Sequence, residues 1–425
     1  MVERTVFIHV PGETEAVPAG RLTMVEQGLQ VQASTFAYGR RYAARANALP
    51  VDPVSLPLSP ESPAQARVPA AGLAVFGALR DATPDAWGRR VIENRLRAPP
   101  NGLPESVYLE HAGPHRAGAL DVRETPDSMP ADGLLPSVLD LRHLLDAAER
   151  IEEGEPVPAH LEMFFAGGPS LGGARPKAVV MVDGCEWIAK FPARNDPFDV
   201  PVVERATLEL AREAGLTVPR TRLERLADGR QVMLIERFDR EPLSRGIGRR
   251  HMVSALTLLA LHEQDSPDAS YAEIADAIGR HGVSGRIGSD RNELFARMVF
   301  NLMVSNDDDH LRNHAFLFDP AGDGWRLSPL YDVVPKPQVS HERRLHLSVG
   351  PQGRAARLDN ALAGAGRFGL LPPDAARIID GIVRVVRRWR ESFEGFGVPA
   401  RECDAIASAF RRAADVGMRE VDRLL

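Results

Sequence analysis

Short apolar runs separated by Pro and Gly occupy the first part of the chain. Residues 6–10 and 29–38 have β-type composition, which predicts strands. Residues 50–69 hold six prolines and predict an extended connector. A helix is predicted to run to about residue 97, with Thr83 as N-cap, because Pro84 suits the first turn. A Pro- and Gly-rich stretch then covers 98–136, before a predicted helix over about 137–152.

Two Asp-Gly dipeptides predict β-hairpins in the middle of the chain. Asp183-Gly184 joins apolar runs at 178–182 and 185–191, and Asp228-Gly229 joins 221–227 to 231–238. A helix at 201–214 is predicted between the two hairpins. Further helices are predicted at 251–262, 270–281, 290–305, 374–392 and 403–424, with short strands at 314–318 and 325–328. A β-rich half followed by a helix-rich half predicts two lobes with a cleft between them.

Composition narrows the class of protein. The 425 residues are 44% hydrophobic and 26% charged, as in ordinary soluble globular proteins. The net charge of −6 gives no general reason to expect nucleic-acid binding. Cys185 and Cys403 are too few for a disulfide framework or a Cys-based metal site, and a reducing cytosol fits them. We expect neither a signal peptide nor a membrane span, since the first residues and the longest apolar runs match neither.

The strongest chemical signal is an acidic loop that follows a predicted helix. Asp308 precedes Asn313 by five residues, and Asp332 follows nineteen residues after Asn313, beyond a short hairpin. This is the order of parts in kinase-like phosphoryl transfer: an Asp for the acceptor hydroxyl, then an Asn and a later Asp for Mg²⁺. Asp307 and Asp309 are neighbouring candidates, but the five-residue interval selects Asp308. The alternative is a solvated turn rich in Asp and Asn.

His310 lies within the acidic loop. It is a candidate either for contact with phosphate or for holding the loop in place. A single loop histidine is more often structural, so both interpretations stay open.

Lysine is scarce in this chain, since only Lys177, Lys190 and Lys336 occur among 52 cationic residues. A phosphate pocket approached by backbone suits the compact ammonium group better than the planar guanidinium. Lys190 has apolar neighbours and would need a counter-charge, which nucleotide phosphates or Glu204 could supply. The alternative is an edge-strand lysine that reaches water. Lys336 receives no role from the sequence.

A glycine-rich loop precedes the first hairpin. Gly172 and Gly173 allow backbone N–H groups to approach phosphate closely. The loop matches neither a Walker A motif nor the kinase Gly-x-Gly-x-x-Gly motif, and a glycine cluster alone is weak evidence. A third segment, 234–240, runs from an apolar strand into charged residues, and its backbone could bond an adenine edge. Its alternative is a strand end with solvated charges.

Together these segments resemble the HipA family of serine/threonine kinase toxins. The matching stretches are 170–177, 188–192, 236–240, 308–313 and 327–332, in the family's order and approximate spacing. Residues 77–81 and Pro84-Asp85 resemble the family's extra N-terminal domain. The resemblance implies an α+β, two-lobed protein-kinase-like fold with a β-rich N-lobe, a helical C-lobe and an additional N-terminal β-rich domain. The implied domains are 1–135, 136–245 and 246–425.

The resemblance also implies site residues. Asp308 would be the catalytic Asp, Asn313 and Asp332 would hold Mg²⁺, and Ser170 would be the autophosphorylated residue. The residues implied to bind the nucleotide are Gly172, Gly173, Ala174, Arg175, Pro176, Lys177, Lys190, Glu236, Arg237, Phe238, His310, Asn313, Tyr331 and Asp332.

The implied function is an ATP- and Mg²⁺-dependent serine/threonine protein kinase that acts as a cytoplasmic toxin. Its implied partner is a HipB-like DNA-binding antitoxin, with DNA contacted only through that partner and no membrane involved. An aminoacyl-tRNA synthetase is the implied kind of substrate. Two alternatives remain: a small-molecule kinase of the aminoglycoside or choline type, and a non-catalytic corepressor partner of the antitoxin.

Overall fold

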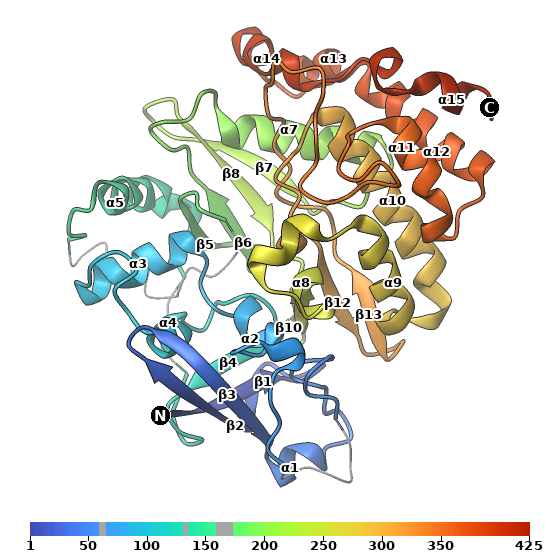
Figure 1. Ribbon diagram of the computed structural model, residues 1–425. Helices are drawn as coiled ribbons and strands as arrows, with labels where there is room; N and C mark the ends of the chain where they lie inside the picture. Colours follow the sequence, from blue (N-terminus) through green and yellow to red (C-terminus); the bar gives the residue numbers. More distant parts are fainter. Residues whose placement is uncertain (59–64, 131–134, 159–172) are drawn as a thin grey trace. The chain divides into compact units, whose positions relative to one another are not determined.

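The computed structural model describes residues 1–58, 65–130, 135–158 and 173–425 (Figure 1). Antiparallel sheets and helices both contribute, which confirms the predicted α+β class. The chain divides into two compact units. The first unit is Met1–Arg194 with Glu224–Leu261, and the second is Asn195–Leu223 with His262–Leu425. Most of the predicted domains 1–135 and 136–245 therefore falls in one unit, and the three-domain division stays a prediction.

The first unit carries most of the strands. Its strands are β1 (Val2–His9), β2 (Ala16–Gln27), β3 (Gln30–Tyr38), β4 (Leu120–Arg123), β5 (Lys177–Val182), β6 (Cys185–Lys190), β8 (Gln231–Glu236), β9 (Arg240–Leu243), β10 (Gly246–Arg249) and β11 (Met252–Ser254). Strand β7 (Thr221–Arg225) contains the boundary between the units. The helices of the first unit are α1 (Arg40–Ala43), η1 (Ala70–Gly72), α2 (Gly77–Asp81), α3 (Ala86–Leu96), α4 (Glu105–His111), η2 (Val138–Asp140), α5 (Leu141–Glu153) and α8 (Ala255–Leu258).

The N-terminal sheet has the order β3-β2-β1-β4, and its neighbours pair antiparallel. Strands β1 and β3 cover the predicted runs except for Val10 and Leu29, whereas β2 was not predicted. Val6 pairs with Gly20 and Phe7 pairs with Pro18, so the register shifts there. Pro is tolerated at such a bulge, although in the sequence it suggests a break.

Helix α3 begins two residues later than predicted. Asp85 is its N-cap, and the Asp85 side chain accepts a hydrogen bond from the Gly88 N–H. The Thr83 hydroxyl instead donates to the Leu79 carbonyl at 2.8 Å, so the prediction of Thr83 as N-cap is wrong. The Pro- and Gly-rich stretch after α3 also contains α4 and β4, which the sequence pattern did not predict.

The second sheet of this unit has the order β5-β6-β8-β7. Asp183 and Gly184 take φ values of +48° and +78°, the left-handed conformations that a two-residue hairpin turn of the predicted kind requires. Buried apolar side chains of α3 and α5 pack with those of β5, β6 and β8 in one hydrophobic cluster. Figure 1 shows α3 and α5 close to this sheet. The cluster holds β5 and β6 in place, and these strands carry two of the candidate site residues.

The second unit is largely helical. Its helices are α7 (Val200–Glu213), η4 (Glu263–Asp268), α9 (Tyr271–His281), η5 (Ser284–Arg286), α10 (Ile287–Val304), η6 (Leu311–Asn313), α11 (Leu358–Gly364), η7 (Ala365–Phe368), α12 (Pro372–Val386), α13 (Trp389–Gly395), α14 (Ala400–Ile406), η8 (Ala407–Ala409), η9 (Ala413–Val416) and α15 (Met418–Asp422). Strands β12 (Ala315–Asp319) and β13 (Gly324–Leu327) form an antiparallel hairpin.

Three predicted helices differ from the structure. The helix at 251–262 is replaced by β11 and the short α8, and the helix at 374–392 divides into α12 and α13. The predicted continuous helix at 403–424 is broken. Phe410 is extended there, with its ring stacked 3.9 Å from the Trp389 ring, and Gly417 has φ +93°. Tertiary packing of the two aromatic rings thus overrides the helical pattern.

No helix in the described parts of the chain is both long and apolar enough to span a membrane.

Candidate active site

The acidic loop leaves the C-terminal end of α10, a largely buried helix of the second unit. Ser305 ends α10 with φ +54°, and its hydroxyl donates to the Ala409 carbonyl at 2.6 Å. The Asn306 N–H donates to the Asn301 carbonyl at 2.9 Å, which closes the helix end. The chain then runs without regular structure until η6. A rigid helix therefore fixes where the loop begins.

The three consecutive carboxylates of this loop have different surroundings. Asp308 is exposed, and its carboxylate accepts no hydrogen bond from the residues that the structure describes. Asp307 forms an ion pair with Lys336, Nζ to Oδ1 3.0 Å. Asp309 is only 1% exposed and accepts hydrogen bonds inside the protein. Of these three residues only Asp308 leaves its carboxylate open to an acceptor hydroxyl, and its catalytic role stays a prediction.

Asn313 is fixed relative to Asp308. Its side-chain Nδ2 donates to the Asp308 carbonyl at 2.8 Å, and its N–H donates to the His310 carbonyl at 2.8 Å. Because the amide nitrogen is used in this way, the Asn313 Oδ1 oxygen points elsewhere and can serve as a ligand. Hard oxygen atoms of this kind are the ligands that Mg²⁺ prefers.

Asp332 follows β13 in an uncommon backbone conformation. Its φ is +57°, in the left-handed region that costs non-glycine residues energy and that Asp tolerates better than most. The preceding Tyr331 donates its hydroxyl to the Arg312 carbonyl at 2.6 Å, which ties this segment to η6. One carboxylate and one amide oxygen, from Asp332 and Asn313, fit a Mg²⁺ ion that keeps several waters and binds substrate phosphates.

His310 is partly exposed at the start of η6. Its ring centroid lies 5.9 Å from that of His346 in an edge-to-face arrangement. This contact is compatible with holding the loop, and it leaves both interpretations of His310 open.

The two lysines of the first hairpin are cross-strand neighbours. Lys177 on β5 pairs directly with Lys190 on β6, so both side chains emerge on the same face of the sheet. Lys177 is 2% exposed and its Nζ lies 2.6 Å from Asp85 Oδ2 and 3.0 Å from the Gly173 carbonyl. Lys190 is half-buried and also pairs with Met233 on β8. Glu204, which the sequence offers beside the nucleotide phosphates as a counter-charge for Lys190, is buried on α7.

The glycine-rich loop is described only from Gly173 onward, so the predictions for Ser170 and Gly172 lie outside the described residues. Gly173 has φ +99°, a conformation that favours glycine. Gly173, Ala174 and Arg175 are exposed, whereas the Pro176 carbonyl accepts the Phe191 N–H at 3.0 Å. The exposed residues are therefore accessible to a ligand, as a phosphate-covering loop requires.

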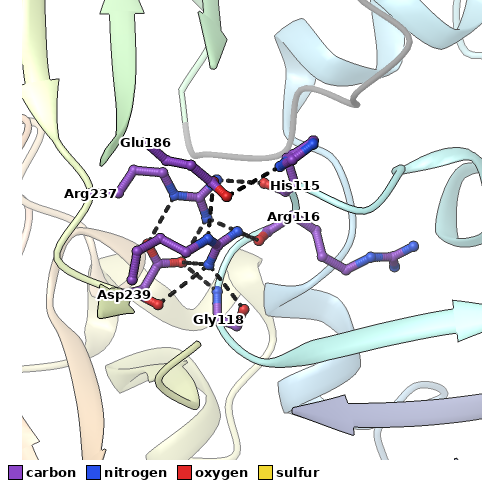
Figure 2. A network of polar contacts seen from close by, with 7 residues as sticks. His115, Arg116, Gly118, Glu186, Arg237 and Asp239 are labelled. Carbon is purple, nitrogen blue, oxygen red and sulfur yellow. Dashed lines mark hydrogen bonds and ion pairs between the residues drawn. The ribbon is translucent and has the colours of Figure 1, made fainter. Parts of the chain in front are cut away.

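Segment 236–240 contains a buried ionic network, shown in Figure 2. Arg237 donates to both Asp239 oxygens at 3.0 and 2.7 Å. It also donates to Glu186 at 3.2 Å and to the carbonyls of His115 and Arg116 at 2.6 and 3.0 Å. All five guanidinium N–H donors thus have partners. The guanidinium is therefore occupied within the protein, and the Arg237 N–H also donates to the Glu186 carbonyl. The predicted contact between Arg237 and the nucleotide is consequently left to the Arg237 backbone carbonyl.

The charges in this network hold one another ionised. Burial alone would raise the pKa of Asp239, but Arg237 and Arg240 lower it to about 2. Burial likewise opposes ionisation of Glu186, yet Arg240, with His115 and Arg237, holds its pKa well below the ordinary value. The network fixes the backbone between β8 and β9, and so determines where Glu236 and Phe238 lie.

Comparison with known proteins adds two relatives. A Haemophilus influenzae protein whose name describes it as a kinase is 26% identical over 199 residues, 42% of this chain and 57% of that protein. The serine/threonine-protein kinase toxin HipA of Shewanella oneidensis is 25% identical over 249 residues, 52% of this chain and 55% of that protein. The chain thus spans just over half the length of these curated relatives.

The fold has a counterpart among solved structures. A chain of the Shewanella oneidensis complex of HipA, HipB and operator DNA matches with a TM-score of 0.67 at 17% identity, covering 99% of this chain and 97% of that one. Because the identity is low, this match is evidence about the fold alone, and it confirms the predicted HipA-type α+β architecture. The family profile described as the HipA-like C-terminal domain matches residues 169–389, more than half of the chain. The protein is therefore a member of the HipA family.

Proposed function

We propose that this protein is an ATP-dependent kinase that transfers the γ-phosphoryl group of ATP to a Ser or Thr hydroxyl of another protein. The observation that carries the proposal is the arrangement of Asp308 and Asn313: an exposed carboxylate five residues before an amide that is fixed to its carbonyl. This matches the catalytic-loop spacing of protein kinases. The two relatives named as kinases support the same class of reaction.

In the proposed reaction, the acceptor oxygen forms a bond to the γ-phosphorus while the bond to the β,γ-bridging oxygen breaks and ADP leaves. Asp308 orients the acceptor hydroxyl and takes its proton. Asn313 Oδ1 and the Asp332 carboxylate would hold Mg²⁺. Bound Mg²⁺ supplies charge neutralisation at the phosphate oxygens.

Nucleotide contacts are proposed for residues of the first unit as well. The Lys190 ammonium would attract the phosphates, and the backbone near Glu236 and Phe238 would meet the adenine. Loop residues 172–177 would cover the phosphates, with Lys177 retaining Asp85 as its partner in the nucleotide-free protein.

The resemblance to HipA also suggests a partner and a biological role for the protein. We propose that the protein is a cytoplasmic toxin that binds a HipB-like antitoxin and contacts DNA only through it. The Shewanella complex of HipA, HipB and operator DNA supports such a partner. An aminoacyl-tRNA synthetase as substrate and Ser170 as autophosphorylation site remain part of the proposal.

The test uses radiolabelled ATP and a whole-cell lysate. Wild type should label a discrete protein band, and Asp308→Asn should abolish labelling while calorimetric binding of Mg-ATP stays within about twofold. A matched control is Asp323→Asn, an exposed Asp with positive φ in the β12–β13 turn, which should label as wild type does. Substantial turnover by Asp308→Asn would show that another residue handles the hydroxyl. Labelling of small molecules alone would instead favour the aminoglycoside or choline type of kinase.

A further inference from the structure

Asp308 lies between two carboxylates that are both held by one later segment of the chain, residues 336–346. Asp307 is bound by Lys336 and by Gln338, whose Nε2 donates to it at 2.8 Å. Asp309 Oδ1 accepts the His346 N–H at 2.8 Å. All of these residues belong to the second unit. The proposed catalytic carboxylate is thus flanked on both sides by anchored neighbours.

Asp309 is held by buried hydrogen bonds that reach α9 and α10. The Tyr271 hydroxyl, 0% exposed, donates to Asp309 Oδ2. Asn301 Nδ2 donates to the Tyr271 hydroxyl at 2.9 Å, and Asn306 Nδ2 donates to Asn301 Oδ1 at 3.1 Å. Hydrogen bonds therefore run from Asp309 through two helices and back to the first residue of the loop. A buried carboxylate is costly without such partners, and here they fix its position.

A second contact chain supports the other side of the loop. The Lys336 N–H donates to the Ser305 carbonyl at 3.2 Å, and Arg343 Nη1 donates to the Ser305 hydroxyl at 2.5 Å. Arg343 Nη2 also donates to the Ser408 carbonyl at 2.7 Å. Segment 336–346 is consequently bonded to the loop at residues 305, 307 and 309.

Asp309 itself is a poor candidate for the group that accepts the proton. Burial raises its pKa to about 7, which would suit a general base. However, the side chain is 1% exposed and both oxygens already accept hydrogen bonds. An acceptor hydroxyl cannot reach it, whereas Asp308 is exposed.

We propose that Asp307 and Asp309 are positioning residues that turn Asp308 outward, with Tyr271 and segment 336–346 as their supports. This deepens the proposed kinase function and rests on it. With a residue on each side anchored, the backbone at 308 has little freedom, and the carboxylate meets the acceptor hydroxyl in one geometry. Displacement of a reacting group by about 1 Å can cost up to about 100-fold in rate. The arrangement also gives Lys336 a role.

The test compares Asp309→Asn and Tyr271→Phe with wild type in steady-state phosphotransfer, together with Mg-ATP binding by calorimetry. Asn keeps an acceptor for the His346 N–H but replaces the oxygen that binds Tyr271 by a donor, and Phe keeps the ring while removing the hydroxyl. We expect kcat to fall by about 10- to 100-fold in each variant with the Kd for Mg-ATP changed less than about twofold. The double variant should be less impaired than the product of the two effects, because both remove the same contact. Lys336→Met, which removes the exposed contact, should lower kcat by about two- to fivefold.

The outcomes separate this inference from the function on which it rests. If wild type transfers no phosphoryl group, the kinase proposal itself fails. If wild type is active and Tyr271→Phe keeps full kcat per ATP-binding site, the positioning role is wrong. Rates are counted per ATP-binding site, so that a loss of folded protein does not imitate a loss of kcat. If Asp309→Asn does not fold, Tyr271→Phe and Lys336→Met still decide the matter. Asp323→Asn serves again as the control.

Discussion

Lys177 and Asp85 form a buried ion pair, with Nζ 2.6 Å from Oδ2 and side chains 3% and 10% exposed. The pair joins the first residue of β5 to the N-cap of α3, and the Trp87 indole N–H donates to the Lys177 carbonyl at 2.9 Å beside it. A lysine that the sequence assigns to a phosphate loop is thus also part of the packing of the first unit.

We expect Asp85→Asn to lower the free energy of unfolding by about 2–4 kcal/mol. Asn is as good an N-cap as Asp, so the loss reports the buried Lys177 charge left without its partner. Urea denaturation measures it, with exposed Asp127→Asn as the control. An unchanged stability would mean that the Lys177 ammonium readily finds another partner, such as bound phosphate.

Lys190→Ala should weaken Mg-ATP binding by about 10- to 100-fold, because a charge-assisted contact to phosphate contributes about 1.5–3 kcal/mol. Titration calorimetry measures the affinity. Arg245→Ala removes an exposed positive charge from the same unit and should leave the affinity unchanged. Equal affinities for Lys190→Ala and wild type would remove Lys190 from the nucleotide site.

Arg237→Lys should lower the free energy of unfolding by about 3–5 kcal/mol. Lys cannot supply five donors in a planar fork, so Asp239, Glu186 and two carbonyls lose partners in a buried site. Urea denaturation, with Arg245→Lys as control, tests this. A variant as stable as wild type that binds ATP weakly would instead identify the guanidinium as a direct nucleotide contact.

The stability of the second unit should carry a pH dependence from Asp309. Its folded pKa is raised to about 7 by burial, above an unfolded value of about 3.9. Between these values the folded protein keeps a proton that the unfolded chain has lost. The Asp309 contribution to stability is therefore largest at low pH and declines as pH rises toward 7, by up to about 1.4 kcal/mol per pH unit.

The measurement is the difference in unfolding free energy between wild type and Asp309→Asn from pH 5 to 8. Tyr271, His314 and His346 also lie near Asp309, but they are present in both proteins, so their contributions to stability largely cancel in the difference. We expect the stability of wild type relative to the variant to fall with rising pH up to about 7 and then to stay level. A difference that is flat across this range would show that Asp309 is ionised throughout.

Several features of the fold and the site could be predicted from local sequence. Asp183-Gly184 predicts its hairpin because only certain residues tolerate the left-handed turn. The five-residue interval between Asp308 and Asn313 matches the catalytic-loop interval of kinases, and this interval selects Asp308 as the predicted catalytic residue. The order of these motifs also resembles the HipA family, and the family match confirms it.

Tertiary structure decided what each charged side chain contacts. The sequence shows three adjacent Asp residues, but only long-range packing against Tyr271 and segment 336–346 makes Asp309 buried, Asp307 paired and Asp308 exposed. Other charged side chains also bind partners far away along the chain. Lys177 binds Asp85, 92 positions earlier, and Arg237 binds the His115 carbonyl, 122 positions earlier. Lys336 binds Asp307, 29 positions earlier. Local sequence determines backbone turns and spacing because these depend on neighbouring residues. Burial and ion pairing depend on which distant segments the fold brings together.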